Sequence, residues 1–209
     1  MDPREKDALL AGAAELGVSL RATAADSLLD YLDRVYRWNS SAKLTTIARL
    51  DAVRLHLLDS LALLPMLGHV STVVDLGSGA GLPGIPLAIC HGELWVSLVE
   101  SRRRKASFLA ETVRDLRLDR CTVIERDAAT LADEDPRFDA VVSRAFLAPE
   151  PLVELASRLI KADGTVFVMT GGAAESLVGA GTAGLVLAAE RRFRLPGGGE
   201  ERRIVALKR

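Results

Sequence analysis

Residues 73–84 read Val-Val-Asp-Leu-Gly-Ser-Gly-Ala-Gly-Leu-Pro-Gly, a short apolar run followed by closely spaced glycines. The β-branched run predicts a buried strand over 72–76, because such residues pack well on a pleated surface. The glycines predict a tight turn that leads into a helix over 82–90. A strand, a glycine-rich turn and a helix together indicate the first unit of an α/β domain that binds a nucleotide or a similar cofactor.

The chain after residue 70 repeats this alternation of strand and helix. Apolar strand-like runs alternate with helically spaced apolar residues, which is typical of a doubly wound parallel sheet. The last two strand-like runs, 184–195 and 201–208, are separated by Pro196-Gly197-Gly198-Gly199, so we expect an antiparallel hairpin there. The other predicted elements are strands at 95–100, 121–125, 138–143 and 164–170 and helices at 101–116 and 149–160.

The first seventy residues show helical periodicity and no strand signal. Their spacing predicts three helices, at 4–16, 25–38 and 46–67, and Gly68 is placed to end the third. We therefore expect an N-terminal helical extension over 1–69 and an α/β core over 70–209.

Composition narrows the class of protein. The 209 residues are 49% hydrophobic and 26% charged, which supports a sizeable core. Lys and Arg number 27 against 28 Asp and Glu, so nucleic-acid binding would have to come from local patches. Two basic clusters qualify: residues 102–105 read Arg-Arg-Arg-Lys, and the stretch from Arg191 onward has a local charge of +5, from seven basic residues against Glu200 and Glu201.

Targeting and metal signals are missing from the sequence. The longest apolar run, 61–67, is too short to span a bilayer and contains Pro65, and the charged N-terminus does not resemble a secretory signal. Cys90 and Cys121 fit no zinc or disulfide spacing. We expect a cytoplasmic monomer with no metal site.

The glycine turn has three possible interpretations: a P-loop, a dinucleotide-binding loop and a loop that binds S-adenosylmethionine. A P-loop is excluded because no lysine follows the glycines. A dinucleotide fingerprint, G-x-G-x-x-G, is present over 79–84, but Asp75 would face the pyrophosphate with a like charge. S-adenosylmethionine carries no phosphate and has an ammonium and a sulfonium group, which Asp75 would favour. Glu100, at the end of the second strand, can accept hydrogen bonds from the ribose hydroxyls of either cofactor.

This pattern favours a Rossmann-like class I methyltransferase fold with a mostly parallel seven-stranded sheet. Asp127, after the third strand, is a candidate for adenine recognition, and Arg144, after the fourth, can hold a phosphate, the substrate base or the cofactor carboxylate. The fourth strand lacks the Asp/Asn-Pro-Pro-aromatic motif of amine methylation, and neither cysteine is placed as a cytosine nucleophile. A ring nitrogen with a free lone pair needs neither device, so we expect such an acceptor.

The chain resembles the bacterial RsmG (GidB) family, which methylates N7 of a guanine in 16S ribosomal RNA. Four segments carry the resemblance: Trp38-Asn39 with Leu44-Thr45, the His-Leu-Leu-Asp-Ser-Leu run over 56–61, the glycine segment 75–88, and the Phe-Asp-Ala-Val-Val-Ser-Arg-Ala run over 138–145. The resemblance implies cofactor contacts at Gly77, Leu82, Asp127, Ala128 and Arg144. It also implies 16S rRNA, or a precursor of the small ribosomal subunit, as partner.

Three positions depart from the pattern of that family. Lys43 precedes Leu44-Thr45 where the family usually has Asn, and Ala128 stands where it usually has an acid. Thr170-Gly171 replaces a frequent Lys-Gly, which removes a charge expected to face RNA.

The sequence predicts an S-adenosylmethionine-dependent guanine-N7 methyltransferase of 16S rRNA. Asp75, Gly77, Gly79, Gly81, Leu82, Glu100, Asp127, Ala128 and Arg144 are the expected cofactor-binding residues. Arg144 positions the reactants, and no general base is expected. The alternatives are a methyltransferase of another RNA site or of a small molecule, a nicotinamide-dependent oxidoreductase, and an RNA-binding module with a vestigial glycine loop. The roles of Trp38, Asn39 and His56 stay open.

Overall fold

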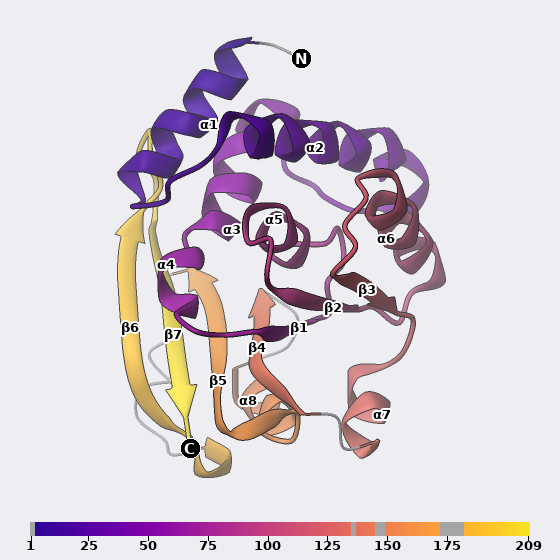
Figure 1. Cartoon of the computed structure of the whole chain (residues 1–209), viewed down its shortest axis with the longest axis vertical. Coiled ribbons are helices and arrows are strands. Elements are labelled where there is room, and N and C mark those ends of the chain that lie inside the picture. Colours follow the sequence, from indigo (N-terminus) through magenta and orange to yellow (C-terminus); the bar gives the residue numbers. More distant parts are fainter. Residues whose placement is uncertain (1–2, 135–136, 145–148, 172–181) are drawn as a thin grey trace.

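The computed structural model describes residues 3–134, 137–144, 149–171 and 182–209. A seven-stranded sheet forms its centre (Figure 1). The strands from β3 to β5 run parallel, and β7 pairs antiparallel with both β5 and β6. This arrangement confirms the predicted fold class and the terminal hairpin. In sheet order the strands are β3 (Cys121–Ile124), β2 (Trp95–Val99), β1 (Thr72–Leu76), β4 (Phe138–Arg144), β5 (Ile160–Gly171), β7 (Glu201–Lys208) and β6 (Val186–Arg194).

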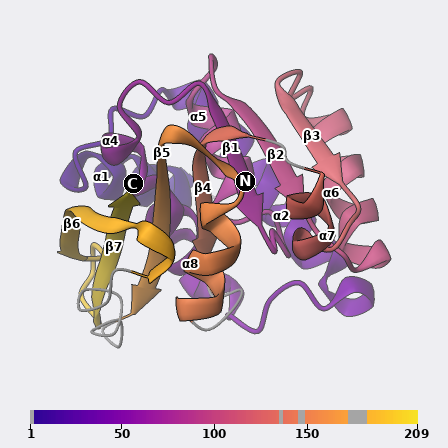
Figure 2. The same cartoon turned by 90° about the horizontal axis from the view of Figure 1, so that it is seen from below.

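Helices cover both faces of this sheet, as the views in Figures 1 and 2 show. One face carries α1 (Pro3–Glu15), α2 (Ala22–Ala42), α5 (Gly84–Cys90) and α6 (Arg103–Asp115). The other face carries α7 (Ala128–Asp133), a short helix that the sequence pattern did not predict, and α8 (Pro149–Ser157). Successive strand residues alternate between the two layers: Val73 packs with the first group and Val74 with the second.

The prediction of one long helix over 46–67 is wrong. The segment divides into a 3₁₀ turn, η1 (Arg49–Asp51), a π-helical turn, η2 (Val53–Leu58), and two short α-helices, α3 (Asp59–Leu61) and α4 (Leu64–Leu67). Pro65 lies in the first turn of α4, where its missing N–H does no harm, so the helix restarts there. Gly68 ends the segment at φ +57°, as its position in the sequence predicted.

The N-terminal helices share one hydrophobic core with the sheet. Leu28 of α2 and Leu57 of η2 are fully buried in the same apolar cluster as Val73 of β1 and Phe108 of α6. Removing these helices would expose that face of the sheet. No helix in the described part of the chain is both long and apolar enough to cross a membrane.

Candidate functional site

The loop after β1 has a backbone that only glycine adopts easily. Gly77, Gly79 and Gly81 have φ values of +68°, +59° and +93°. A Cβ on Gly81 would lie 2.5 Å from Ile85 Cδ1, so packing of the loop against α5 also requires glycine there. At Gly79 the nearest atoms would be 3.7 Å away or more, which leaves the outer side of the loop open to a ligand.

Asp75 of β1 lies beneath the loop. Its side chain is fully buried, and Oδ2 accepts a hydrogen bond of 3.0 Å from the Gly84 amide at the start of α5. Burial raises the pKa of Asp75 to about 7. The predicted contact of Asp75 with the cofactor stays a prediction, and the raised pKa weakens the electrostatic objection to a pyrophosphate. Asp75 fastens α5 to β1.

Glu100 lies at the carboxyl end of β2, next to the glycine loop. Its Oε2 accepts a hydrogen bond of 3.0 Å from the Gly79 amide, and its Oε1 accepts one of 2.8 Å from the Arg102 amide. A carboxylate has about four acceptor positions, so both oxygens keep capacity for ribose hydroxyls. The predicted contact with the ribose stays a prediction, but the placement beside the loop agrees with it.

The third strand leads to the remaining residues predicted to bind the cofactor. Asp127 is exposed and caps α7 by accepting a hydrogen bond of 2.9 Å from the Ala129 amide. Ala128 and Leu82 are buried. The parallel strands β1, β2 and β3 place the three loops at one edge of the sheet, which is where open α/β sheets bind ligands.

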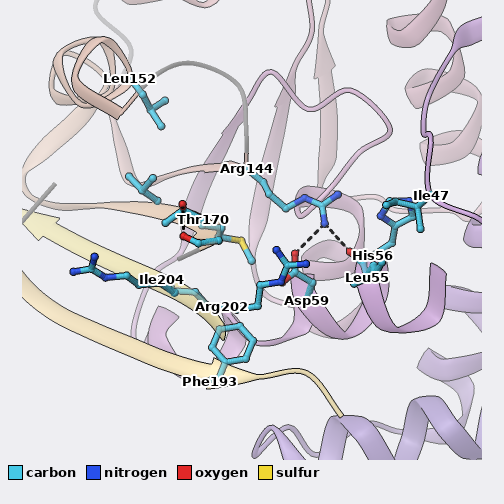
Figure 3. A pocket seen from close by; sticks show the side chains of 14 residues that line it. Ile47, Leu55, His56, Asp59, Arg144, Leu152, Thr170, Phe193, Arg202 and Ile204 are labelled. Atoms are coloured by element: carbon cyan, nitrogen blue, oxygen red, sulfur yellow. Dashed lines mark hydrogen bonds and ion pairs between the residues drawn. The ribbon is translucent and has the colours of Figure 1, made fainter. Parts of the chain in front are cut away.

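A cavity of about 550 Å³ lies at the ends of β4 and β5, against η2 and α3. Figure 3 shows Arg144, Asp59 and Arg202 converging on it. The Arg144 guanidinium donates hydrogen bonds of 3.1 Å to both the Leu55 carbonyl and Asp59 Oδ2. Thr170 and Gly171 also line the cavity, and Arg202 of β7 lies opposite Gly171 in the sheet register. A guanidinium is thus present on this wall although residue 170 is not a lysine. Ala145 and Phe146, which follow Arg144, lie outside the described residues.

His56 lines the same cavity and is held by the N-terminal segment. Its Nε2 is 2.8 Å from Thr45 Oγ1, and Asn39 Oδ1 accepts hydrogen bonds from the amides of Leu44 and Thr45. Burial and the nearby charge of Arg144 lower the pKa of His56 to about 4, so the ring is neutral at physiological pH. The structure therefore places His56 in the wall of the cavity. Asn39 supports it by holding the backbone of Leu44 and Thr45, and Thr45 contacts His56.

Trp38 serves a different purpose. Its ring packs on Phe108 of α6, with the ring centroids 5.9 Å apart, and its Nε1 donates a hydrogen bond to Glu111. It holds α2 against α6 and does not line the cavity.

The two basic clusters differ in structure. Arg102, Arg103 and Arg104 are exposed at the start of α6, and Lys105 Nζ lies near the glycine loop. In the C-terminal stretch, Arg191 donates to the carbonyls of Leu16 and Ala62. Other side chains of that stretch make internal contacts as well: Arg192 and Arg203 with Glu190, Arg202 with Asp59, and Arg209 with the Ser157 carbonyl. Most of the charge in this stretch is therefore engaged within the fold, and its predicted contact with RNA stays a prediction.

Sequence reasoning missed three residues of this region. They are Tyr31, whose hydroxyl donates a hydrogen bond to the Ala80 carbonyl in the glycine loop, and Asp59 and Arg202 at the cavity. None of the three stands out in the pattern of loops and strand ends, although Asp59 lies in the His-x-x-Asp-Ser-Leu run. No metal-binding cluster of His, Cys, Asp or Glu occurs among the residues that the structure describes.

Solved structures share this fold at low sequence identity. TrmN from Thermus thermophilus superposes with a TM-score of 0.56 at 18% identity, covering 72% of this chain and 48% of that one. A precorrin-6y C5,15-methyltransferase from Geobacter metallireducens GS-15 gives 0.54 at 16%, covering 81% and 92%. The fold is that of the Rossmann-like methyltransferases.

Sequence relatives are more specific. The family described as rRNA small subunit methyltransferase G matches residues 24–205. A relative of that name from Anaeromyxobacter sp. (strain Fw109-5) is 39% identical over 202 residues, covering 94% of each chain. One from Neisseria meningitidis (serogroup A / serotype 4A, strain DSM 15465 / Z2491) is 35% identical over 205 residues, covering 98% of each. The chain belongs to the rRNA small subunit methyltransferase G family, and is thus a methyltransferase dependent on S-adenosylmethionine.

Proposed function

We propose that this protein transfers a methyl group from S-adenosylmethionine to N7 of a specific guanine in 16S ribosomal RNA. The observation that carries the proposal is the family match over residues 24–205. The substrate is either the RNA itself or a precursor of the small ribosomal subunit, and the protein acts as a cytoplasmic monomer.

The residues at the sheet edge fit the cofactor. Three glycines with positive φ shape the loop, its outer side is open at Gly79, and Glu100 accepts a hydrogen bond from the Gly79 amide. The cofactor would lie along Gly77, Gly79, Gly81 and Leu82, with Glu100 at its ribose and the Asp127-Ala128 pair at its adenine. Arg144 marks its end toward the acceptor. Once bound, S-adenosylmethionine supplies an electrophilic methyl group on a sulfonium.

The neighbouring cavity suits an acceptor that gives up no proton. Guanine N7 attacks through its lone pair, so the chain need only orient the base and exclude water. His56 fits this task because it is neutral, and thus adds no cation beside a base that becomes positively charged. Arg144 is positive, but Asp59 offsets its charge at 3.1 Å.

The proposal includes a division of labour along the chain. Residues 1–69 form a helical extension that closes the acceptor side, and residues 70–209 form the core that binds the cofactor. Leu55, His56 and Asp59 line the cavity from the extension, which supports this division.

The test is nucleoside mass spectrometry of 16S rRNA from cells with and without the gene. We expect 7-methylguanosine to fall by one residue per 16S molecule in the deletion strain and to return when the wild-type gene is supplied. A Gly77→Arg gene, whose product we expect not to bind S-adenosylmethionine, serves as the control for expression without activity. An unchanged content of 7-methylguanosine, with loss of a different methylated nucleoside, would replace guanine N7 by that acceptor.

A further inference from the structure

Asp59 stands between two arginines that come from different strands. Its Oδ2 accepts a hydrogen bond of 3.1 Å from Arg144 at the end of β4, and its Oδ1 lies 3.8 Å from Arg202 Nε on β7. The Asp59 side chain is only 11% exposed, against 20% for Arg144 and 27% for Arg202. A single carboxylate from the helical extension thus meets two guanidiniums on the wall of the cavity.

Arg144 has a defined orientation because two acceptors share its terminal nitrogen. One is Asp59, and the other is the Leu55 carbonyl at 3.1 Å in the π-helical turn η2. π-Helical turns are rare and often occur at functional sites. Here η2 brings a backbone carbonyl and, directly after the turn, a carboxylate to the same guanidinium.

The charge of Asp59 also matters to the cavity. Without it, Arg144 and Arg202 would face each other as like charges in a site that is partly shielded from water, where repulsion is stronger than on the surface. The Arg144 guanidinium would then move away from Arg202. A displacement of about 1 Å in a positioning group is enough to cost on the order of a hundredfold in rate.

We propose that Asp59 is a positioning residue for the methyl transfer, acting through Arg144. It holds the Arg144 guanidinium at the boundary between the cofactor loops and the acceptor cavity, and it also pairs with Arg202 from β7. It touches neither the cofactor nor the reacting atoms. This inference rests on the proposed function. It assigns to Asp59 the effect of the helical extension on the reaction.

The experiment is a double-mutant cycle on the chemical step. Asp59→Asn keeps the shape of the side chain and removes its charge. Single-turnover rates are measured with S-adenosylmethionine and 16S rRNA, both saturating, for wild type, Asp59→Asn, Arg144→Ala and the double variant. We expect Asp59→Asn to slow the step by about tenfold to a hundredfold, and to have no further effect once Arg144 is alanine.

Asp115→Asn provides the matched control. Asp115 accepts a hydrogen bond of 2.7 Å from Arg34, and the two side chains are 32% and 19% exposed, so this pair resembles the Asp59–Arg144 pair but lies between α2 and α6. The Asp115→Asn variant should have a lower thermal midpoint of unfolding but an unchanged single-turnover rate of methyl transfer. Asp59→Glu keeps the charge one methylene away and should give a rate between those of wild type and Asp59→Asn. It also serves if Asp59→Asn does not fold.

Three results would overturn the inference. One is a wild-type rate in Asp59→Asn or in Asp59→Glu, and another is a loss in the double variant equal to the product of the two single losses. The third is a wild type that transfers no methyl group to the RNA, which overturns the proposed function and this inference with it. Only the first two leave the proposed function standing, so the two failures are distinguishable.

Discussion

Tyr31 of α2 donates a hydrogen bond of 2.8 Å from its hydroxyl to the carbonyl oxygen of Ala80, inside the glycine loop. The side chain of Tyr31 is fully buried, and burial raises its pKa well above the ordinary value, so the hydroxyl keeps its proton. A helix from the N-terminal extension therefore supports the loop that we assign to the cofactor.

Tyr31→Phe tests this support. The variant keeps the ring and removes the hydroxyl, so it should lower the free energy of unfolding by about 1–3 kcal/mol, the cost of an unsatisfied buried partner. We also expect weaker binding of S-adenosylmethionine in calorimetry, because the loop loses a fixed point. Tyr36→Phe is the control, since its hydroxyl bonds to the Ile47 carbonyl away from the loop. Equal cofactor affinity in both variants would show that the bond serves stability alone.

Gly77→Arg should abolish binding of S-adenosylmethionine. A side chain at this position fills space that the bare backbone leaves for the ligand, and φ of +68° is unfavourable for arginine. Gly17→Arg is a matched control with the same kind of backbone, at φ +76°, and with no atom within 4 Å of its Cβ position. Both variants place arginine at a similar positive φ, and isothermal calorimetry should show loss of binding only in Gly77→Arg. Full affinity in Gly77→Arg would remove this loop from the cofactor site.

Glu100→Ala should weaken the binding of S-adenosylmethionine and of its demethylated product by similar factors. Hydrogen bonds to a charged group are worth about 1.5–3 kcal/mol, and the ribose is common to both molecules. The structure adds an effect on stability, because Glu100 also accepts hydrogen bonds from the amides of Gly79 and Arg102. Glu100→Gln, which retains an acceptor, should fall between the alanine variant and wild type. Loss of turnover at full product affinity would instead place Glu100 at the acceptor.

The chemical step should be independent of pH between about pH 6 and 8, because guanine N7 carries no proton to remove. His56 titrates far below this range, with a pKa of about 4. Single-turnover rates at saturating RNA and cofactor measure the step. A steep rise through this range that His56→Ala abolishes would identify His56 as a general base, and the guanine-N7 assignment would then be withdrawn.

Two buried groups should give stability opposite dependences on pH. The pKa of His56 falls from 6.5 to about 4 on folding, so the unfolded chain binds a proton that native His56 does not, and acidification through this window destabilises the fold. The pKa of Asp75 rises from 3.8 to about 7, so the native state binds the extra proton and acidification stabilises it. Each group changes the free energy of unfolding by at most about 1.4 kcal/mol per pH unit, and in wild type the two changes have opposite signs and offset each other.

Urea unfolding of two variants between about pH 4.5 and 7 separates these contributions. Relative to wild type, His56→Gln should gain stability as the pH falls, and Asp75→Asn should lose it. Parallel curves for both variants and wild type would contradict the assignment of these two groups.

Much of this protein was predictable from local sequence. The β-branched run before the glycines predicted β1, helical and strand spacing predicted most later elements, and Pro196-Gly197-Gly198-Gly199 predicted the terminal hairpin. Gly77, Gly79 and Gly81 marked the loop because no other residue adopts such backbone angles at low cost. These features depend on neighbours along the chain, and sequence contains that information directly.

Tertiary structure decided what the polar residues do. Asp75 and Glu100 are both buried near the glycine loop, yet Asp75 accepts a hydrogen bond from the start of α5, whereas Glu100 accepts one from the Gly79 amide inside the loop. Asp59 contacts Arg144 and Arg202, which lie far from it in the chain. The π-helical turn Val53–Leu58 comes just before Asp59, and the helical periodicity of the sequence did not predict this turn. Hydrogen bonds and charge pairs form between groups that folding brings together, so only the folded chain shows which of them meet.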